Sequence, residues 1–302
     1  MRYRPLAHLP MAVSALSLKL DDQYQRSVSD WTALGMAALD CGINCFEVAG
    51  HSPALVDGLA RALSTVERRL IYVAWRLGPK SMPPVYANNA FTSTGMEGLT
   101  KAALARTNLG YLDLVQLDDP GQQDLSADGL QTLRQMKADG LVRALGLAGD
   151  GDEIDTYIST GAFAVLTLPF SMLSGWRERR RLKAAGERNM SVLGADPYPE
   201  AMLAVVEAAK PKRGLMGLMQ KPAGVAPAPY SFLHNTPEWT AEEICVAFAL
   251  TEPAVATVQI EPRDADHLRA LAALAERHLP AGLPAQIEMS HFTTLGKDQK
   301  HA

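Results

Sequence analysis

Cysteine is scarce in this chain, which has three, Cys41, Cys45 and Cys245, among its 302 residues. A sparse, odd count gives no disulfide framework and is typical of proteins in a reducing compartment. No second Cys/His pair lies at zinc spacing, so core packing explains Cys41 and Cys45 better than metal binding does. The count therefore excludes a disulfide-stapled fold and predicts no metal site.

Long hydrophobic runs and a strong net charge are also missing. No apolar stretch reaches the roughly 18 residues that span a bilayer. The opening MRYRPLAHLP lacks the apolar core and cleavage site of a signal peptide. The formal net charge is −4, which argues against nucleic acid or an anionic membrane as a partner. We expect a soluble, cytoplasmic protein, whose one basic cluster, WRERRRLK at 176–183, is predicted to be the solvated face of a helix.

Short apolar runs alternate with segments of helical periodicity along the chain. Runs of this kind, rich in Val, Leu or Ile, suit parallel strands that are covered on both faces. The alternation predicts a (β/α)8 barrel. An open doubly wound sheet is the alternative, but no GxGxxG follows the first strand. The expected strands are 15–20, 44–48, 70–75, 112–117, 142–148, 164–170, 190–195 and 255–261, and the expected helices are 26–41, 53–63, 95–107, 126–139, 176–186, 199–210, 240–250 and 264–278.

Two long stretches interrupt this rhythm. Residues 77–94 follow the third strand, where barrel loops build the catalytic face. Residues 211–238 are rich in Pro and Gly, and loops of this length are usually functional or mobile. Two placements stay open for the second loop: an apolar lid over the pocket, or packing against the side of the barrel. We expect one barrel domain over 1–283 and a tail over 284–302, either disordered or a docking segment. The residues expected to form the lid are Met216, Met219, Tyr230 and Phe232.

Six ordered segments resemble the aldo-keto reductase family over residues 2 to about 278. The resemblance implies a (β/α)8 barrel with an N-terminal β-hairpin and a pocket at the carboxyl ends of the strands for NADPH and a carbonyl substrate. In the family a Tyr protonates the substrate, a Lys lowers the pKa of the Tyr, an Asp holds the Lys and a His orients the carbonyl. The segments are YRPLAHLPMAVSALSLKL, ALDCGINCFEVAG, RRLIYVAWRLG, ALARTNLGYLDLVQLDDP, LRQMKADGLVRALGLAG and AVATVQIEPRDADHLRALAAL.

The four catalytic positions all depart from the family pattern. Glu47 stands at the Asp position, Arg76 at the Lys position and Asp118 at the His position. Ser52 replaces the Tyr and cannot act as its acid, whereas His51 beside it carries an imidazole, a group that ordinarily titrates near pH 6.5. Arg76 stays cationic, and we expect it to pair with Glu47 within about 6 Å.

The expected NADPH contacts are eroded as well. Phe170 still offers a ring face for the nicotinamide, and Arg263 still offers a basic group for the 2′-phosphate. The family's glycine in the final segment becomes Glu261, an acid near the expected phosphates. The residues that would contact NADPH, if it binds, are Thr167, Phe170, Ser171, Asp196, Arg263 and His267.

Three functions remain open from the sequence. The first is a pseudoenzyme without reductase activity, or a barrel repurposed to bind a small polar molecule or a protein partner. The second is an NADPH-dependent reductase with His51 as acid and Arg76 as cation. The third is lyase or isomerase chemistry, with Glu47, Arg76, Asp118 and His51 as base, cation, second acid and relay. The ligand types of Glu47, His51 and Asp118 would suit a divalent metal, but these residues have no dedicated metal spacing.

Overall fold

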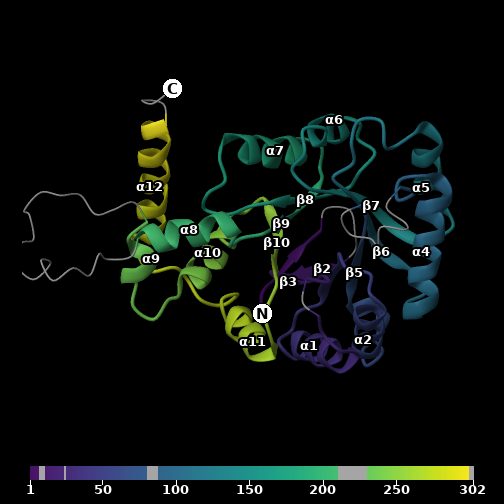
Figure 1. The fold of residues 1–302 in the computed structure, drawn as a ribbon, viewed down its shortest axis with the longest axis horizontal. Helices are drawn as coiled ribbons and strands as arrows, with labels where there is room; N and C mark the ends of the chain where they lie inside the picture. The colour runs from purple at the N-terminus through teal and green to yellow at the C-terminus, as the bar shows by residue number, and fades with distance from the viewer. Residues whose placement is uncertain (7–10, 24, 80–87, 210–229, 299–302) are drawn as a thin grey trace, which may run out of the picture.

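Eight parallel strands close into a barrel (Figure 1). The structure is a computed structural model that describes residues 1–6, 11–23, 25–79, 88–209 and 230–298. Around the barrel the order is β10, β3, β4, β5, β6, β7, β8, β9. The predicted (β/α)8 barrel is confirmed, and the open sheet is excluded. The strands are β3 (Leu16–Leu20), β4 (Cys45–Val48), β5 (Tyr72–Leu77), β6 (Leu112–Asp118), β7 (Val142–Ala148), β8 (Val165–Pro169), β9 (Ser191–Ala195) and β10 (Val255–Ile260).

A two-stranded antiparallel hairpin precedes the barrel, as expected. It pairs β1 (Tyr3–Pro5) with β2 (Ala12–Ser14). Val13 packs in one apolar cluster with Cys45 and Tyr72, the first inward-facing residues of β4 and β5. The hairpin therefore covers the amino-terminal end of the barrel, and Cys45 is a core residue.

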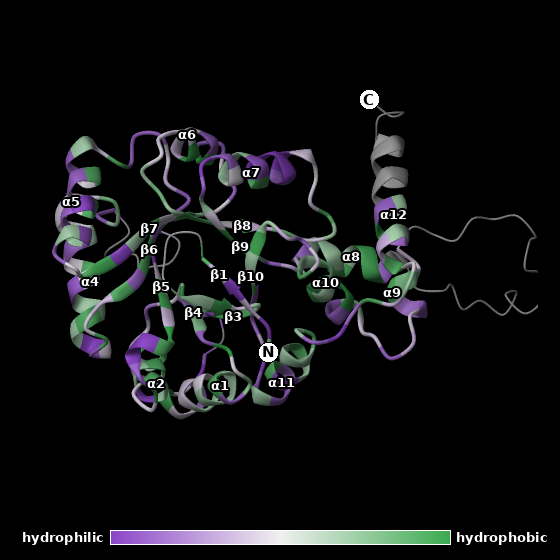
Figure 2. Cartoon of the chain, turned by 180° about the vertical axis from the view of Figure 1, so that it is seen from behind, coloured by the Kyte–Doolittle hydropathy of each residue, from purple (hydrophilic) through white to green (hydrophobic). Residues whose placement is uncertain are grey.

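Helices surround the strands, with their polar faces outward (Figure 2). The sequence predicted all of them except α6, α9 and α12. α6 spans too few residues to show a helical period. α12 lies within the region expected to be a tail, which is helical through Asp298. The helices are α1 (Val28–Asp40), α2 (Pro53–Leu63), α4 (Ser93–Thr107), α5 (Ala127–Ala138), α6 (Ile154–Ser159), α7 (Trp176–Glu187), α8 (Glu200–Ala209), α9 (Phe232–Asn235), α10 (Ala241–Ala249), α11 (Ala265–Ala273) and α12 (Leu283–Asp298).

Most of the basic cluster on α7 is solvent-facing as predicted, but one of its arginines is not. Arg181 is fully buried, so it does not belong to a solvated face. Its guanidinium donates to the backbone carbonyls of Asp150 (2.8 Å) and Gly151 (2.6 Å) and pairs with Asp155. A buried guanidinium needs several acceptors, and the loop after β7 provides them. Arg181 therefore fixes a loop at the carboxyl end of the barrel.

The end of the second long loop packs beside the barrel. Tyr230 and Phe232 are buried in the main core, with ring centroids 5.9 Å apart. The short helix α9 contacts α8 and α10. These two aromatics therefore belong to the helical layer, while Met216 and Met219 lie outside the described residues. Within the part of the chain that the structure describes, no helix is both long and apolar enough to cross a bilayer.

Candidate active site at the barrel mouth

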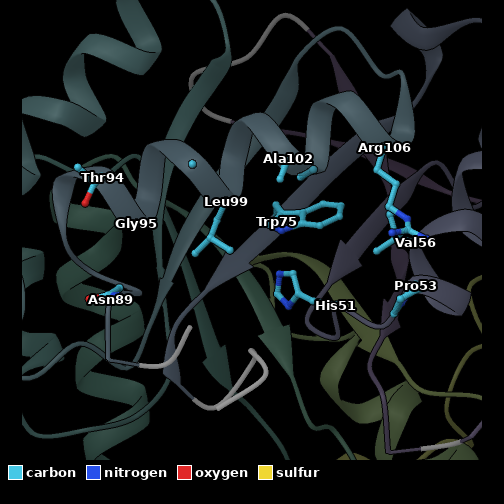
Figure 3. A pocket seen from close by; sticks show the side chains of 12 residues that line it. His51, Pro53, Val56, Trp75, Asn89, Thr94, Gly95, Leu99, Ala102 and Arg106 are labelled. Atoms are coloured by element: carbon cyan, nitrogen blue, oxygen red, sulfur yellow. The ribbon is translucent and has the colours of Figure 1, made fainter. Parts of the chain in front are cut away.

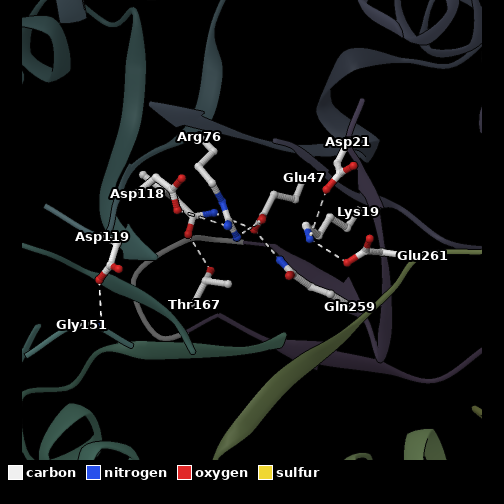
Figure 4. Close-up of polar contacts among 11 residues, drawn as sticks. Lys19, Asp21, Glu47, Arg76, Asp118, Asp119, Gly151, Thr167, Gln259 and Glu261 are labelled. Carbon is white, nitrogen blue, oxygen red and sulfur yellow. Dashed lines mark hydrogen bonds and ion pairs between the residues drawn. The ribbon is translucent and has the colours of Figure 1, made fainter. Parts of the chain in front are cut away.

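Glu47 and Arg76 meet at the carboxyl ends of β4 and β5 (Figure 4). Arg76 donates from Nη2 to Oε1 of Glu47, and its Nη1 lies 3.3 Å from Oδ1 of Asp118 on β6. The expected ion pair is present, and Asp118 joins it as a second acceptor. Gly78 follows β5 and leaves room for Asp118, because any Cβ at position 78 would collide with it.

Glu47 has no exposed surface, and its second oxygen is also occupied. Oε2 accepts from Nε2 of Gln116 (2.9 Å) and from Nε2 of Gln259. Gln116 in turn accepts from the hydroxyl of Thr167 at 2.5 Å. A carboxylate held by one guanidinium and two amides is a structural counter-ion, so it is poorly placed to remove a proton from a ligand.

The charge of Arg76 is fixed by this arrangement. Burial alone would lower the pKa of its guanidinium, but Glu47 and Asp118 outweigh burial and raise it. A group that stays charged across the accessible pH range can orient or neutralise a ligand but cannot transfer a proton.

A second ion pair lies on the rim, where Nζ of Lys19 is 2.6 Å from Oε1 of Glu261. Nε2 of Gln23 donates to the other oxygen of Glu261 at 2.7 Å. Burial alone would lower the pKa of the Lys19 ammonium, but Glu261 raises it. The acid at position 261, which the sequence marked as unfavourable for phosphates, therefore has its own cation.

Two cavities open above these groups. The larger measures about 580 Å³ and extends over β9 and β10, with Asp196, Tyr198 and Glu242 in its wall. The smaller measures about 270 Å³ and extends toward β6 and β7. Lys19, Asp21 and Arg76 line both. The acidic groups around the two cavities outnumber these two cations; they are Asp21, Asp118, Asp119, Asp150, Asp196, Glu200, Glu242 and Glu261.

His51 and Ser52 lie elsewhere. Ser52 caps α2, and its hydroxyl accepts from the backbone N–H of Leu55 at 3.3 Å. The backbone amides of both residues donate to Oδ2 of Asp22, at 2.7 and 2.9 Å. The His51 ring contacts Trp75 edge-on, with centroids 5.3 Å apart, and lines a third cavity between α2 and α4. The structure therefore brings Glu47, Arg76 and Asp118 together and does not bring His51 into either mouth cavity.

Asp119 shapes the smaller cavity. Its backbone adopts the left-handed conformation, with φ of 51°. Its Oδ1 accepts from the backbone N–H of Gly151 at 2.8 Å, in the loop that Arg181 holds. A Cβ at Gly149 would lie 2.9 Å from the Asp119 side chain, so a glycine is needed there. Among the residues that the structure describes, no cluster of three His, Cys, Asp or Glu side chains could hold a metal ion.

Sequence reasoning missed Lys19, Gln116 and Gln259 as parts of this site. Each lies in a strand that alternates polar and apolar residues over part of its length: LSLKL, LDLVQLD and VATVQI. Strand alternation could have found them, because the next polar residue on the same face is two positions away.

Comparison with known proteins agrees with the barrel fold. The sequence model of the Aldo/keto reductase family matches residues 20–289. The chain belongs to the aldo/keto reductase family. Among solved structures, it is similar to the aldo-keto reductase AKR11C1 from Bacillus halodurans in its apo form (19% identity, TM-score 0.69) and holo form (18%, TM-score 0.70). Each match covers 96% of both chains. No curated protein sequence matches the chain. At this identity the likeness concerns the fold alone, and the two forms match it almost equally.

The residues expected to contact the nicotinamide half of NADPH are occupied by protein contacts. Phe170 is buried and stacks on Phe248, with centroids 6.3 Å apart and planes inclined by 10°. The hydroxyl of Thr167 binds Gln116. Ser171 closes a turn, with its hydroxyl accepting from the backbone N–H of Leu173 at 3.1 Å. These side chains form part of the core and do not offer a nicotinamide platform.

The residues expected around the phosphates fit no better. Nε2 of His267 lies 3.1 Å from Oε2 of Glu242, and Arg263 is exposed and lines neither mouth cavity. Partial burial, together with Glu261, raises the pKa of Asp196, so the cavity is a poor environment for negative charge. An acid-lined cavity repels a dinucleotide that carries several phosphate charges. The residues present therefore do not fit NADPH.

Proposed function

We propose that this chain does not reduce carbonyl compounds with NADPH and that its barrel mouth binds a small polar molecule. The observation that carries the proposal is the saturation of Glu47 by Arg76, Gln116 and Gln259. In the family's chemistry the equivalent pair activates a phenol. Here Glu47 and Arg76 form a permanently charged pair at the bottom of the pocket, and Ser52 at the family's Tyr position cannot act as an acid.

One phenol does line the larger cavity, but its environment opposes catalysis. Burial, with Cys245 and Glu242 nearby, raises the pKa of Tyr198. A general acid is most effective when its pKa lies near the working pH, and a raised phenol pKa moves away from it. Tyr198 therefore supports binding by hydrogen bonds better than proton donation.

The charge of the mouth indicates the kind of ligand. Acidic groups predominate around both cavities, and the two cations, Lys19 and Arg76, already face carboxylates. A ligand that donates hydrogen bonds or carries positive charge, such as an amine or a polyol, meets acceptors there. A phosphate or dicarboxylate meets repulsion.

Calorimetric titration with NADPH and NADH tests the first half of the proposal. We expect no saturable binding tighter than about 1 mM. Micromolar binding of either nucleotide would overturn the proposal and restore the reductase. Native mass spectrometry of the freshly purified protein tests the second half. A retained, non-nucleotide mass that is lost in Asp196→Leu, which removes an acceptor from the cavity wall, supports a ligand in the mouth.

Acid–base chemistry without a nucleotide is a second candidate. It is favoured by the raised pKa of Asp196, a carboxyl group that shares a cavity with Arg76. Such a pair could supply a proton donor and a polarising cation to a lyase or isomerase reaction. The test is to incubate the protein and its retained ligand in D2O and to measure how much carbon-bound hydrogen of the ligand exchanges for deuterium. The native chain is compared with Asp196→Asn. Equal exchange in both would exclude this role of Asp196.

A further inference from the structure

The cavity between α2 and α4 lies outside the barrel and is separate from the mouth (Figure 3). It measures about 640 Å³, which is within the range of small-molecule sites. Val56 of α2 and Leu99, Ala102 and Ala103 of α4 give it apolar walls. Trp75 of β5 lies across its back.

Trp75 brings a polar group into this apolar space. It faces outward from the barrel because its neighbour Arg76 faces inward. Its side chain is 2% exposed, and its indole Nε1–H has no hydrogen-bond partner within the described part of the chain. Figure 3 shows the nitrogen-bearing ring on the side of His51 and Leu99. Buried N–H donors are nearly always satisfied, so an acceptor from outside the chain would complete this one.

The charged side chains around the cavity offer little to an ionic ligand. Arg106 at one end is held by Asp57 through two hydrogen bonds, of 2.6 and 2.9 Å. None of the described residues that line the cavity is acidic. A cation would find no counter-ion, and an anion would have to compete with Asp57 for Arg106.

We propose that this cavity binds an uncharged, mainly apolar ring compound whose acceptor receives a hydrogen bond from Nε1–H of Trp75. None of the residues that the structure describes lines both this site and either mouth cavity. It does not depend on the function proposed for the mouth, so either proposal can fail alone.

Coumarin and naphthalene make a matched pair of probes. Both are uncharged bicyclic molecules of similar size, and coumarin alone carries a carbonyl acceptor. The chain has four tryptophans and so four indole N–H signals in a ¹H–¹⁵N spectrum; the signal lost in Trp75→Phe identifies Trp75. We expect coumarin to shift this signal downfield in a saturable way, and naphthalene to bind more weakly without a downfield shift. The absence of a coumarin shift up to its solubility limit would overturn the proposal, and so would an equal effect of naphthalene.

Two glycines provide variants that locate the binding. Gly98 on α4 lines the cavity, and Gly186 on α7 does not. A Cβ built at either meets no atom within 4 Å, so both helices accept a larger side chain. We expect Gly98→Leu to weaken coumarin binding by about tenfold or more, because its side chain occupies the cavity. Gly186→Leu should leave the affinity unchanged. Unchanged binding in Gly98→Leu, with its thermal unfolding temperature preserved, would place the ligand elsewhere and refute the proposal.

Discussion

Glu47 holds Arg76 through one carboxylate oxygen, while its other oxygen accepts from two glutamine amides. This relationship explains how the mouth tolerates a buried charge pair. Both carboxylate oxygens of Glu47 accept from donors, and the guanidinium of Arg76 also reaches Asp118. These contacts leave Glu47 poorly placed to remove a proton from a ligand.

Glu47→Gln should destabilise the fold strongly. The substitution keeps the shape of the side chain but leaves Arg76 without its main counter-ion. The new amide nitrogen must also face either the N–H groups of Arg76 or those of Gln116 and Gln259, which are all donors. We expect a loss of about 3 kcal/mol in the free energy of unfolding, measured by urea denaturation. The matched control is Asp57→Asn, which breaks the solvent-exposed pair with Arg106 and should cost much less. Similar losses in the two variants would show that the buried network contributes little.

Arg181 and Arg180 offer a second matched comparison on one helix. Both pair with Asp155, but Arg181 is buried and also donates to two backbone carbonyls, whereas Arg180 lies at a half-exposed site. Lysine cannot reproduce the fork of N–H groups, so Arg181→Lys should leave a buried carbonyl unsatisfied and cost about 2–4 kcal/mol. Arg180→Lys should cost less than about 1 kcal/mol. If urea denaturation gives equal values, Arg181 does not anchor the loop after β7.

Asp22 ties two loops of the mouth together through the backbone amides of His51 and Ser52. Asp22→Ala removes both acceptors, so these two amides should exchange with solvent roughly tenfold faster by hydrogen-exchange mass spectrometry. Asp21→Ala is the control, since Asp21 faces Lys19 and not the amides. Unchanged exchange in Asp22→Ala would mean that α2 and its cap alone hold this loop.

The strands and most helices of the barrel could be predicted from the sequence, because the patterns that identify them are local. Strands such as β8 are buried on both faces, so they consist mostly of apolar residues and can be recognised without knowledge of the tertiary structure. The Ser52–Pro53 start of α2 is equally local, because cap and first turn are adjacent in the chain. α6 and α9 were missed because elements of six and four residues carry no measurable period.

The site was harder to predict because its partners are distant in sequence. Gln259 reaches Glu47 across 212 positions, and Arg181 reaches the loop at Gly151 from inside a basic run that looked solvent-facing. Phe170 kept the ring that the family resemblance required, but the packing of Phe248 against it is visible only in three dimensions. The family resemblance therefore predicted where these residues lie in the barrel better than it predicted which groups they contact.

Tyr72 makes stability depend on alkaline pH. Burial, with Cys45, Asp113 and Glu47 nearby, raises the pKa of its phenol well above its ordinary value. When the pKa of a group is raised in the folded state, its contribution to stability is complete below the pKa of the unfolded state, about 10 for Tyr, and is lost as pH rises beyond that value.

Tyr72→Phe tests this dependence. The hydroxyl of Tyr72 has no hydrogen-bond partner among the described residues, so Tyr72→Phe should cost little at pH 7. Above about pH 10 the native chain should lose up to about 1.4 kcal/mol per pH unit more than Tyr72→Phe. Guanidinium unfolding between pH 8 and 11 measures this difference, with the exposed Tyr3→Phe as control; parallel curves for the native chain and Tyr72→Phe would contradict it.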